Sequence, residues 1–219
     1  MTGQTHRILI GSCGWQHEGW QDSYYPADLP SEWRLGYYSN EFPLAVVTER
    51  ERAQAEDLPG EMADCREDLW VLVSVTNDAG LESAVDLLQQ LPRQGGVLLQ
   101  VDPAACRDPD AWLAQIAPRL NGQPLCVDPV RLLNEAWRDA LRARSIGWSW
   151  NSHSDADGLA LGPLAVIRVD GDCSARQLRD YLEAGLAVSR PTRDVALVID
   201  GQPPDVETLR QAKQIEELL

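Results

Sequence analysis

Four aspartates stand where carboxylates could do chemistry. They directly follow short apolar runs that predict β-strands: Asp102, Asp128, Asp170 and Asp200. If these strands lie parallel in one barrel, their carboxyl ends share one rim and the carboxylates converge there. Converging carboxylates raise some of one another's pKa values and attract a hard divalent cation such as magnesium or manganese. Asp170 and Asp200 are the candidate metal ligands.

An aspartate between a strand and a helix is also a common N-cap or turn residue. This interpretation is favoured for Asp128, because Pro129 suits the first position of a helix. For Asp102 both interpretations stay open, since the next helix is predicted to begin later, at Asp108-Pro109. Asp170 and Asp200 are the better site candidates.

Three residues are candidates for moving a proton: Asp170, His153 and Asp102. His153 lies in a polar stretch, residues 151–155, after a predicted strand, and is the best placed of the three histidines for acid-base work. The alternative is an ordinary loop histidine exposed to solvent.

Arg168 lies inside an apolar strand, and strand alternation places it on the same face as Asp170. If that face is the barrel lumen, Arg168 is a buried guanidinium that could bind a substrate carboxylate or phosphate. If it is the outer face, Arg168 pairs with a neighbouring acid. Gln100, at the end of another strand, is a further candidate for contact with a ligand.

Four residues cluster after the first predicted strand: Cys13, Trp15, His17 and Trp20. Cys13 and His17 could form a nucleophile and its base if they lie close together; otherwise Cys13 is a small residue filling the barrel mouth. Trp15 and Trp20 are candidate binding residues that could stack on a sugar or a base. They could equally form a packed corner.

Composition excludes several classes of protein. The chain has 219 residues and a formal charge of −15, which disfavours binding to nucleic acid or to anionic membrane surfaces. It has no apolar run long enough to span a membrane and no leader pattern, so the expected location is the cytoplasm. Its five scattered cysteines predict reduced thiols. No dinucleotide, nucleoside-triphosphate or HExxH zinc motif is present.

Eight apolar runs predict strands that alternate with helices. They span residues 7–12, 44–48, 69–75, 97–101, 124–127, 146–150, 164–169 and 195–199. The pattern predicts an α/β fold, a compact TIM-like (β/α)8 barrel forming a single domain over residues 1–219. Because such barrels usually have about 250 residues, some helices must be short or missing.

Helix signals accompany these strands. Asp108-Pro109 and Asp128-Pro129 mark two predicted starts, and Ser174 with Gln177 has the spacing of a capping box. Apolar stripes predict amphipathic helices over 112–120 and 132–141. The charge-dense run 49–57 is typical of a solvated helix face.

The segment Ile10 to Pro43 resembles the opening of the YecE-like family, a domain of unknown function numbered seventy-two. The residues that carry the resemblance are Ile10-Gly11-Ser12-Cys13-Gly14-Trp15, Gly19-Trp20, Tyr24-Tyr25-Pro26, Leu29-Pro30, Leu35-Gly36-Tyr37-Tyr38 and Phe42-Pro43. Gly95 to Pro103 is similar to the family's fourth strand, and Arg168-Val169-Asp170-Gly171 to its Arg-Leu-His-Gly motif. The resemblance implies a TIM-barrel-like fold.

Departures from the family pattern fall on its polar residues. Ala45 to Arg50 replaces the family's Val-Glu-Ile-Asn-Ser-Thr-Phe-Tyr, and Ser74 replaces a lysine. Asp128 to Arg131 replaces Glu-x-Arg-His, Asp170 replaces a histidine, and Asp200-Gly201 replaces an asparagine pair. The chain resembles a divergent member with a largely rewritten polar site.

Three hypotheses of function follow. The first is a barrel that binds a small anionic or sugar-like molecule, or a weak enzyme, with its mouth built from Trp15, Gln100, Arg168, Asp170 and Asp200. The second is a hydrolase or isomerase that uses a divalent metal. The third is a non-catalytic barrel that binds another protein. The oligomeric state stays open.

Overall fold

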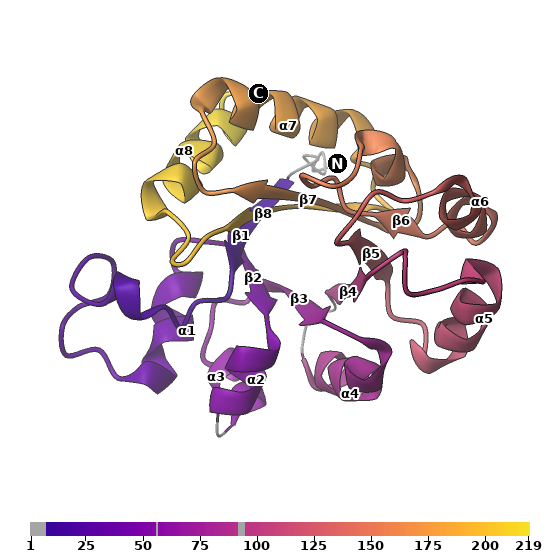
Figure 1. Ribbon diagram of the computed structural model, residues 1–219. Helices are drawn as coiled ribbons and strands as arrows, with labels where there is room; N and C mark the ends of the chain where they lie inside the picture. The colour runs from indigo at the N-terminus through magenta and orange to yellow at the C-terminus, as the bar shows by residue number, and fades with distance from the viewer. Residues whose placement is uncertain (1–7, 56, 92–94) are drawn as a thin grey trace.

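The computed structural model describes residues 8–55, 57–91 and 95–219. In these residues eight parallel strands form one sheet that curls into a barrel, with helices around the outside (Figure 1). The strands are β1 (Ile8–Cys13), β2 (Leu44–Val47), β3 (Trp70–Val75), β4 (Gly96–Val101), β5 (Leu125–Pro129), β6 (Gly147–Trp148), β7 (Leu164–Asp170) and β8 (Asp194–Asp200). The predicted compact TIM-like barrel is confirmed.

The two ends of the sheet, β6 and β7, are joined by a short bridge. In the strand order β6-β5-β4-β3-β2-β1-β8-β7 these two are the edge strands. Their edges meet at an isolated β-bridge between Trp150 and Ile167. The N–H of Trp150 donates to the carbonyl of Val166, and the N–H of Arg168 donates to the carbonyl of Trp150, each at 2.9 Å. This bridge nearly closes the barrel.

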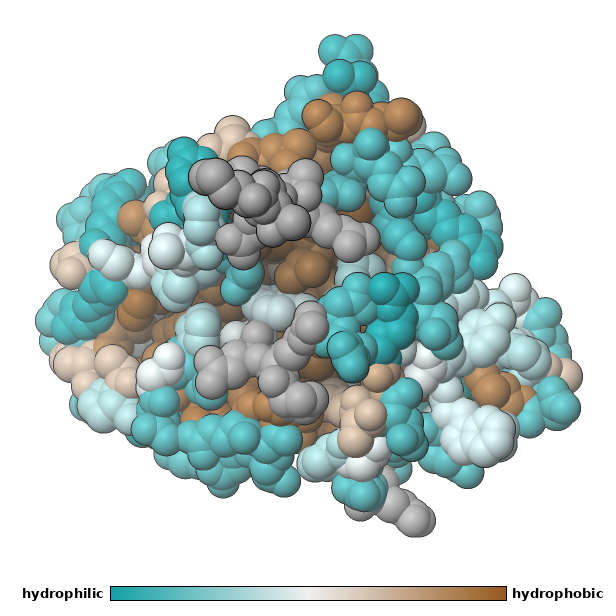
Figure 2. All heavy atoms as spheres, turned by 180° about the vertical axis from the view of Figure 1, so that it is seen from behind, coloured by the Kyte–Doolittle hydropathy of each residue, from teal (hydrophilic) through white to brown (hydrophobic). Residues whose placement is uncertain are grey.

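Short helices make the barrel compact. The helices are α1 (Arg34–Ser39), α2 (Glu49–Gln54), α3 (Leu58–Ala63), α4 (Leu81–Gln90), α5 (Pro109–Arg119), α6 (Glu135–Ala143), α7 (Ala175–Val188) and α8 (Val206–Glu216). Between β6 and β7 the described chain forms only a 3-10 helix, η4 (Ala156–Ala160). The prediction of short or missing helices is therefore confirmed. Seen from behind, the outer surface is mainly hydrophilic (Figure 2), and no helix among the described residues could cross a membrane.

Two of the predicted helix starts are confirmed by their caps. The Asp108 side chain accepts a hydrogen bond from the N–H of Ala111, and Pro109 begins α5. Ser174 and Gln177 form the capping box of α7. The charged run after β2 forms α2, as predicted.

The predicted helix start at Asp128-Pro129 is wrong. Asp128 and Pro129 are the last two residues of β5, and α6 begins only at Glu135, with Asn134 as its N-cap. Proline fits a strand end as well as a first helical turn, because either position can lack its N–H. Leu132, expected on the buried stripe of this helix, lies before it and is 74 % exposed.

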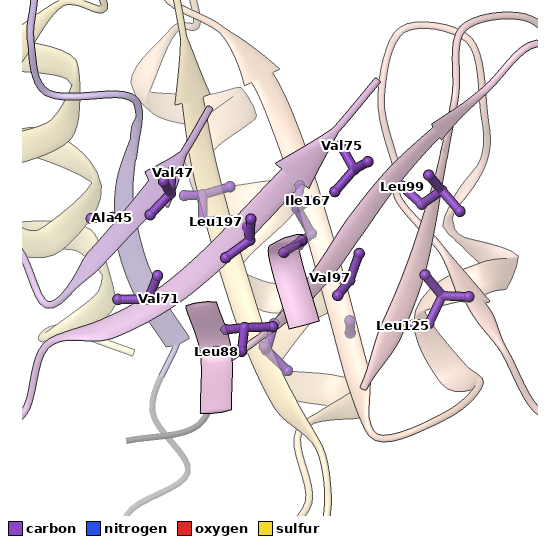
Figure 3. Packing of buried hydrophobic residues seen from close by; sticks show 14 of the residues in the cluster. Ala45, Val47, Val71, Val75, Leu88, Val97, Leu99, Leu125, Ile167 and Leu197 are labelled. Atoms are coloured by element: carbon purple, nitrogen blue, oxygen red, sulfur yellow. The ribbon is translucent and has the colours of Figure 1, made fainter. Parts of the chain in front are cut away.

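Strand alternation builds two apolar layers. One face of each strand packs against the helices, as the buried side chains in Figure 3 show. The opposite face fills the lumen with residues such as Leu72, Leu98, Val166 and Val198. Because the side-chain period of a strand is two, the lumen face of β7 continues from Val166 to Arg168 and Asp170. Polar residues thus cap an apolar lumen at the carboxyl ends of the strands.

Candidate functional site at the barrel mouth

A polar cavity of about 230 Å³ lies at this rim of the barrel. Its lining includes five residues that the sequence singled out: Gln100, His153, Arg168, Asp170 and Asp200. Asp128 and Asn151 also line it. The carboxyl ends of barrel strands are where enzymes of this fold place their active sites. The structure therefore brings most of the predicted site residues together at the expected place.

Arg168 is held between two carboxylates. Its side chain is 17 % exposed, and its Nη1 forms an ion pair with Asp128. Its Nε donates to Oδ2 of Asp200 at 2.9 Å, and its Nη2 forms an ion pair with the same oxygen at 2.8 Å. Burial lowers the pKa of Arg168, but the charges of Asp128 and Asp200 raise it more, so the pKa lies above its ordinary value. Arg168 faces the lumen, as one interpretation of the sequence predicted, and stays charged.

Asp128 is the most buried carboxylate of the mouth, with its side chain 2 % exposed. Its Oδ1 accepts hydrogen bonds from Ser149 Oγ at 2.5 Å and from Asn151 Nδ2 at 3.0 Å. A buried charge is tolerated when it is paired and its remaining lone pairs are hydrogen-bonded. Arg168, Ser149 and Asn151 together meet that requirement.

Sequence reasoning missed the roles of Ser149 and Asn151. Both follow β6, which ends at Trp148, and the N–H of Ser149 still donates to β5, at the carbonyl of Val127, 2.8 Å away. The period of two over residues 147–151 would have placed both side chains on one face.

Asp200 carries a carboxyl group whose pKa is raised. Its side chain is 23 % exposed, and burial raises the pKa although Arg168 lowers it. The single guanidinium is shared with Asp128, so it cannot fully offset the burial of two carboxylates. Asp200 thus takes up a proton more readily than an exposed aspartate.

This pKa predicts a signed effect of pH on stability. A carboxyl whose pKa is higher in the folded than in the unfolded protein makes folding less favourable as pH rises through that interval. The asparagine in Asp200→Asn does not ionise. The free energy of unfolding of this variant, relative to wild type, should therefore increase as pH rises above 3.8, the ordinary pKa of an aspartate. Urea unfolding across this pH range measures it. The exposed Asp180→Asn is the control, and a parallel pH trend in both variants would contradict the prediction.

Cys13 and His17 do not form a catalytic pair. Burial, and next the charge of Asp200, raise the pKa of the Cys13 thiol to about 12, so the thiol is protonated at neutral pH. The Nε2 of His17 lies 3.1 Å from the backbone carbonyl of Cys13, and burial lowers the pKa of His17. Cys13 packs against the lumen core, which agrees with its interpretation as a filler of the mouth.

The mouth carries an excess of negative charge. Asp128, Asp170 and Asp200 line it with Arg168 as the only arginine or lysine, and Asp170 is exposed. With its guanidinium bonded to two carboxylates, Arg168 cannot form a bidentate pair with an incoming anion unless one of them is displaced. The expectation that Arg168 binds a carboxylate or phosphate is therefore disfavoured.

The two predicted metal ligands lie next to each other on neighbouring strands. Asp170 and Asp200 are in register on β7 and β8, so their side chains leave the sheet on the same side. Oδ2 of Asp200 is already engaged by Arg168. Across residues 8–55, 57–91 and 95–219, no group of three or more histidine, cysteine, aspartate or glutamate side chains is placed to hold an ion. Magnesium keeps several waters and is often held by one or two carboxylates, so the part of Asp170 and Asp200 as metal ligands stays a prediction.

Asp102 lies outside the cavity. It follows the end of β4, its Oδ1 accepts from the N–H of Ala104 at 2.9 Å, and Arg131 lies 3.5 Å from its carboxylate. β4 ends at Val101, so Asp102 lies outside the strand and does not follow Gln100 on the lumen face. These contacts support its interpretation as a turn residue, and its part in proton transfer stays a prediction.

Trp15 and Trp20 are packed inside the protein. They are 1 % and 2 % exposed, and Trp20 Nε1 donates to the carbonyl of Pro204 at 2.8 Å. Trp20 also stacks on Tyr38 with ring centroids 6.1 Å apart. This burial favours the packed-corner interpretation, and contact of these two residues with a ligand stays a prediction.

His153 is exposed at the edge of the cavity. Its backbone N–H donates to Oδ1 of Asn151 at 2.8 Å, which links the loop to the polar cluster around Asp128. Its part in acid-base chemistry stays a prediction.

Comparison with known proteins supports the fold. No family profile and no curated protein sequence matches the chain. Homocysteine methyltransferase MmuM from Escherichia coli is similar in structure, with a TM-score of 0.53, 14 % identity, and coverage of 95 % of this chain and 96 % of that one. Phosphoribosyl anthranilate isomerase from Thermococcus kodakaraensis has a TM-score of 0.41, 11 % identity, and coverage of 95 % and 98 %. At these identities the likeness concerns the barrel alone.

Proposed function

We propose that the mouth of this barrel binds a small, uncharged, hydroxyl-bearing molecule of sugar-like type. The observation that carries the proposal is the arginine held between two carboxylates in a polar cavity, Arg168 between Asp128 and Asp200. A fixed arrangement of donors and acceptors suits hydroxyl groups, because each hydroxyl both donates and accepts a hydrogen bond.

The chemistry of the lining supports a neutral ligand over an anion. A guanidinium has five N–H donors, and the hydrogen bonds of Arg168 to Asp128 and Asp200 use one on Nε and one on Nη1, which leaves three donors. Asp170 and Asp200 offer acceptor oxygens, and the Gln100 amide offers both kinds of group. The excess negative charge repels phosphate and carboxylate ligands.

Proton transfer at the same mouth is a second candidate function. Asp200 is favoured for it, because its raised pKa lies nearer to neutral pH and its side chain is partly exposed in the cavity. Asp170 and His153 line the same cavity and would complete an acid-base set for a weak enzyme. A bell-shaped dependence of turnover on pH that is lost in Asp200→Asn would support this activity.

We also propose that the chain is a divergent YecE-like protein. The residues that carry the resemblance include Trp20, Tyr25, Tyr38 and Phe42, which are buried in one aromatic cluster beside β1. Such residues are needed for packing whatever the mouth binds. A shared scaffold with a rewritten polar rim is therefore physically consistent.

Ligand binding can be tested with saturation-transfer NMR. We expect hexoses, pentoses and polyols to give saturation transfer, and a sugar phosphate to bind more weakly than the same sugar without its phosphate. Gln100→Ala should weaken the neutral ligand several-fold, because it removes one donor and one acceptor. Gln89→Ala, at an exposed position on α4, is the matched control. Tighter binding of the phosphate, or equal losses in both variants, would overturn the proposal.

A further inference from the structure

An exposed aromatic pair lies outside the mouth, near the start of α1. Trp33 is 65 % exposed and Tyr37 is 40 % exposed. All eight tryptophans lie in the described part of the chain, and Trp33 alone is exposed. The loop between β1 and α1 projects at the left of Figure 1, and Figure 2, which is turned by 180°, shows pale and brown atoms among the teal ones at the lower right. Large exposed aromatic side chains of this kind are typical of binding surfaces.

The pair borders a hollow of about 320 Å³ with acidic walls. Glu32, Glu61 and Asp64 line it together with Leu29 and the two aromatic residues. Gly36 also lines it, and no heavy atom lies within 4 Å of the position that a Cβ would take at this residue. The hollow therefore has room for a side chain from outside.

The three carboxylates lack a cationic partner. In the part of the chain that the structure describes, none of them forms an ion pair with arginine or lysine. Oε2 of Glu61 is shielded from solvent and receives no hydrogen bond there. The three acids line the same hollow, and burial, and next the charge of Glu32, raise the pKa of Glu61. A cation placed in the hollow would relieve this repulsion.

We propose that this hollow docks an arginine-bearing segment of a partner protein. The guanidinium plane stacks on Trp33 or Tyr37, where the negative face of an aromatic ring attracts a cation. Its N–H groups donate to Glu32, Glu61 or Asp64, which satisfies the unpaired oxygens. The formal charge of −15 on the chain also draws basic segments toward it.

A peptide fits this surface better than a small free cation does. Glu32 and Glu61 also line a second hollow, of about 560 Å³, which continues the first toward Arg34 and Arg50. Arg34, bonded to the side-chain oxygens of Gln16 and Gln21 at 3.4 and 2.5 Å, and Arg50 keep positive charge in this second hollow, so the arginine of the segment belongs in the first hollow. The two adjoining hollows, which share Glu32 and Glu61 in their walls, are called the groove below.

Fluorescence anisotropy with a labelled peptide tests the proposal. The peptide carries arginines spaced by glycine and serine, and its counterpart carries citrulline, which keeps the shape and removes the charge. At about 150 mM salt, where distant charges are screened, we expect Trp33→Ala and Glu32→Gln/Asp64→Asn each to weaken binding about tenfold. The matched controls are the exposed Leu132→Ala and Asp139→Asn/Asp180→Asn, which should leave binding unchanged.

Each result decides the matter. Loss of binding in the groove variants alone, with little binding of the citrulline peptide, supports the proposal. Equal losses in Asp139→Asn/Asp180→Asn would show general attraction to an acidic protein and overturn it. Binding of free arginine amide as tight as that of the peptide would show a site for a small cation instead. Because the groove shares no lining residue with the barrel mouth, these outcomes leave the proposal of sugar binding untouched.

Discussion

Replacing Arg168 by methionine is expected to lower the free energy of unfolding by about 3–5 kcal/mol at neutral pH. Methionine is similar in length to arginine but has no charge, so the carboxylates of Asp128 and Asp200 lose their cation. Asp128 is nearly inaccessible to water, so solvent cannot replace the lost ion pair. Chemical unfolding at pH 7 measures the loss.

The same variant has a pH signature that a simple packing defect lacks. The pKa of Asp200 is raised by burial, and protonation of this carboxyl removes part of the uncompensated charge, so the stability deficit should shrink toward pH 4. Arg142→Met is the matched control, because Arg142 pairs with Glu135 and Asp139 at the surface and should matter by less than about 1 kcal/mol. A deficit that is equal at pH 4 and pH 7 would contradict the ion-pair account.

Trp20→Ala is expected to cost about 3–5 kcal/mol of stability. The ring is 2 % exposed, packs among aromatic neighbours, and ties the loop after β1 to the loop after β8 through the carbonyl of Pro204. The loss combines an unfilled cavity with an unpaired carbonyl. Trp33→Ala, at an exposed ring of the same type, should change stability by no more than about 0.5 kcal/mol. Thermal and chemical unfolding compare the two variants directly.

Trp20→Phe separates the ring from its hydrogen bond. It keeps most of the aromatic packing and removes the Nε1 donor to Pro204, which should cost about 1–3 kcal/mol. A Trp20→Ala protein of normal stability that had lost ligand binding would contradict the structural role and restore the earlier interpretation of Trp20 as a binding residue.

Local pattern was enough to predict the barrel. The strands are continuous apolar runs because helices cover one face and a filled lumen covers the other, as Val166 and Ile167 show on opposite faces of β7. The same alternation placed Arg168 in the lumen once the fold was known. Helix caps such as Asp108 could be predicted because a cap depends only on one side chain and the backbone of the next few residues.

Residues whose roles depend on distant partners could not be predicted. Pro129 made Asp128 look like a helix cap, and only the approach of Arg168 from β7 reveals the carboxylate as a buried ion pair. Trp15 and Trp20 have the composition of a stacking lid, but the chain around them buries both rings. Asp102 misses the mouth because β4 ends one residue before it, and strand ends are the least certain feature of a sequence pattern.

The most direct test of the account is the NMR signal of the Arg168 Nε–H, assigned by its shift in Asp200→Asn. The bond to Asp200 should protect this signal from exchange with solvent at pH 7. The account predicts that the signal is visible, that it moves on titration with neutral sugars or polyols, and that inorganic phosphate leaves it in place. A signal that moves with phosphate and ignores every neutral ligand would contradict the proposal that this mouth binds an uncharged molecule.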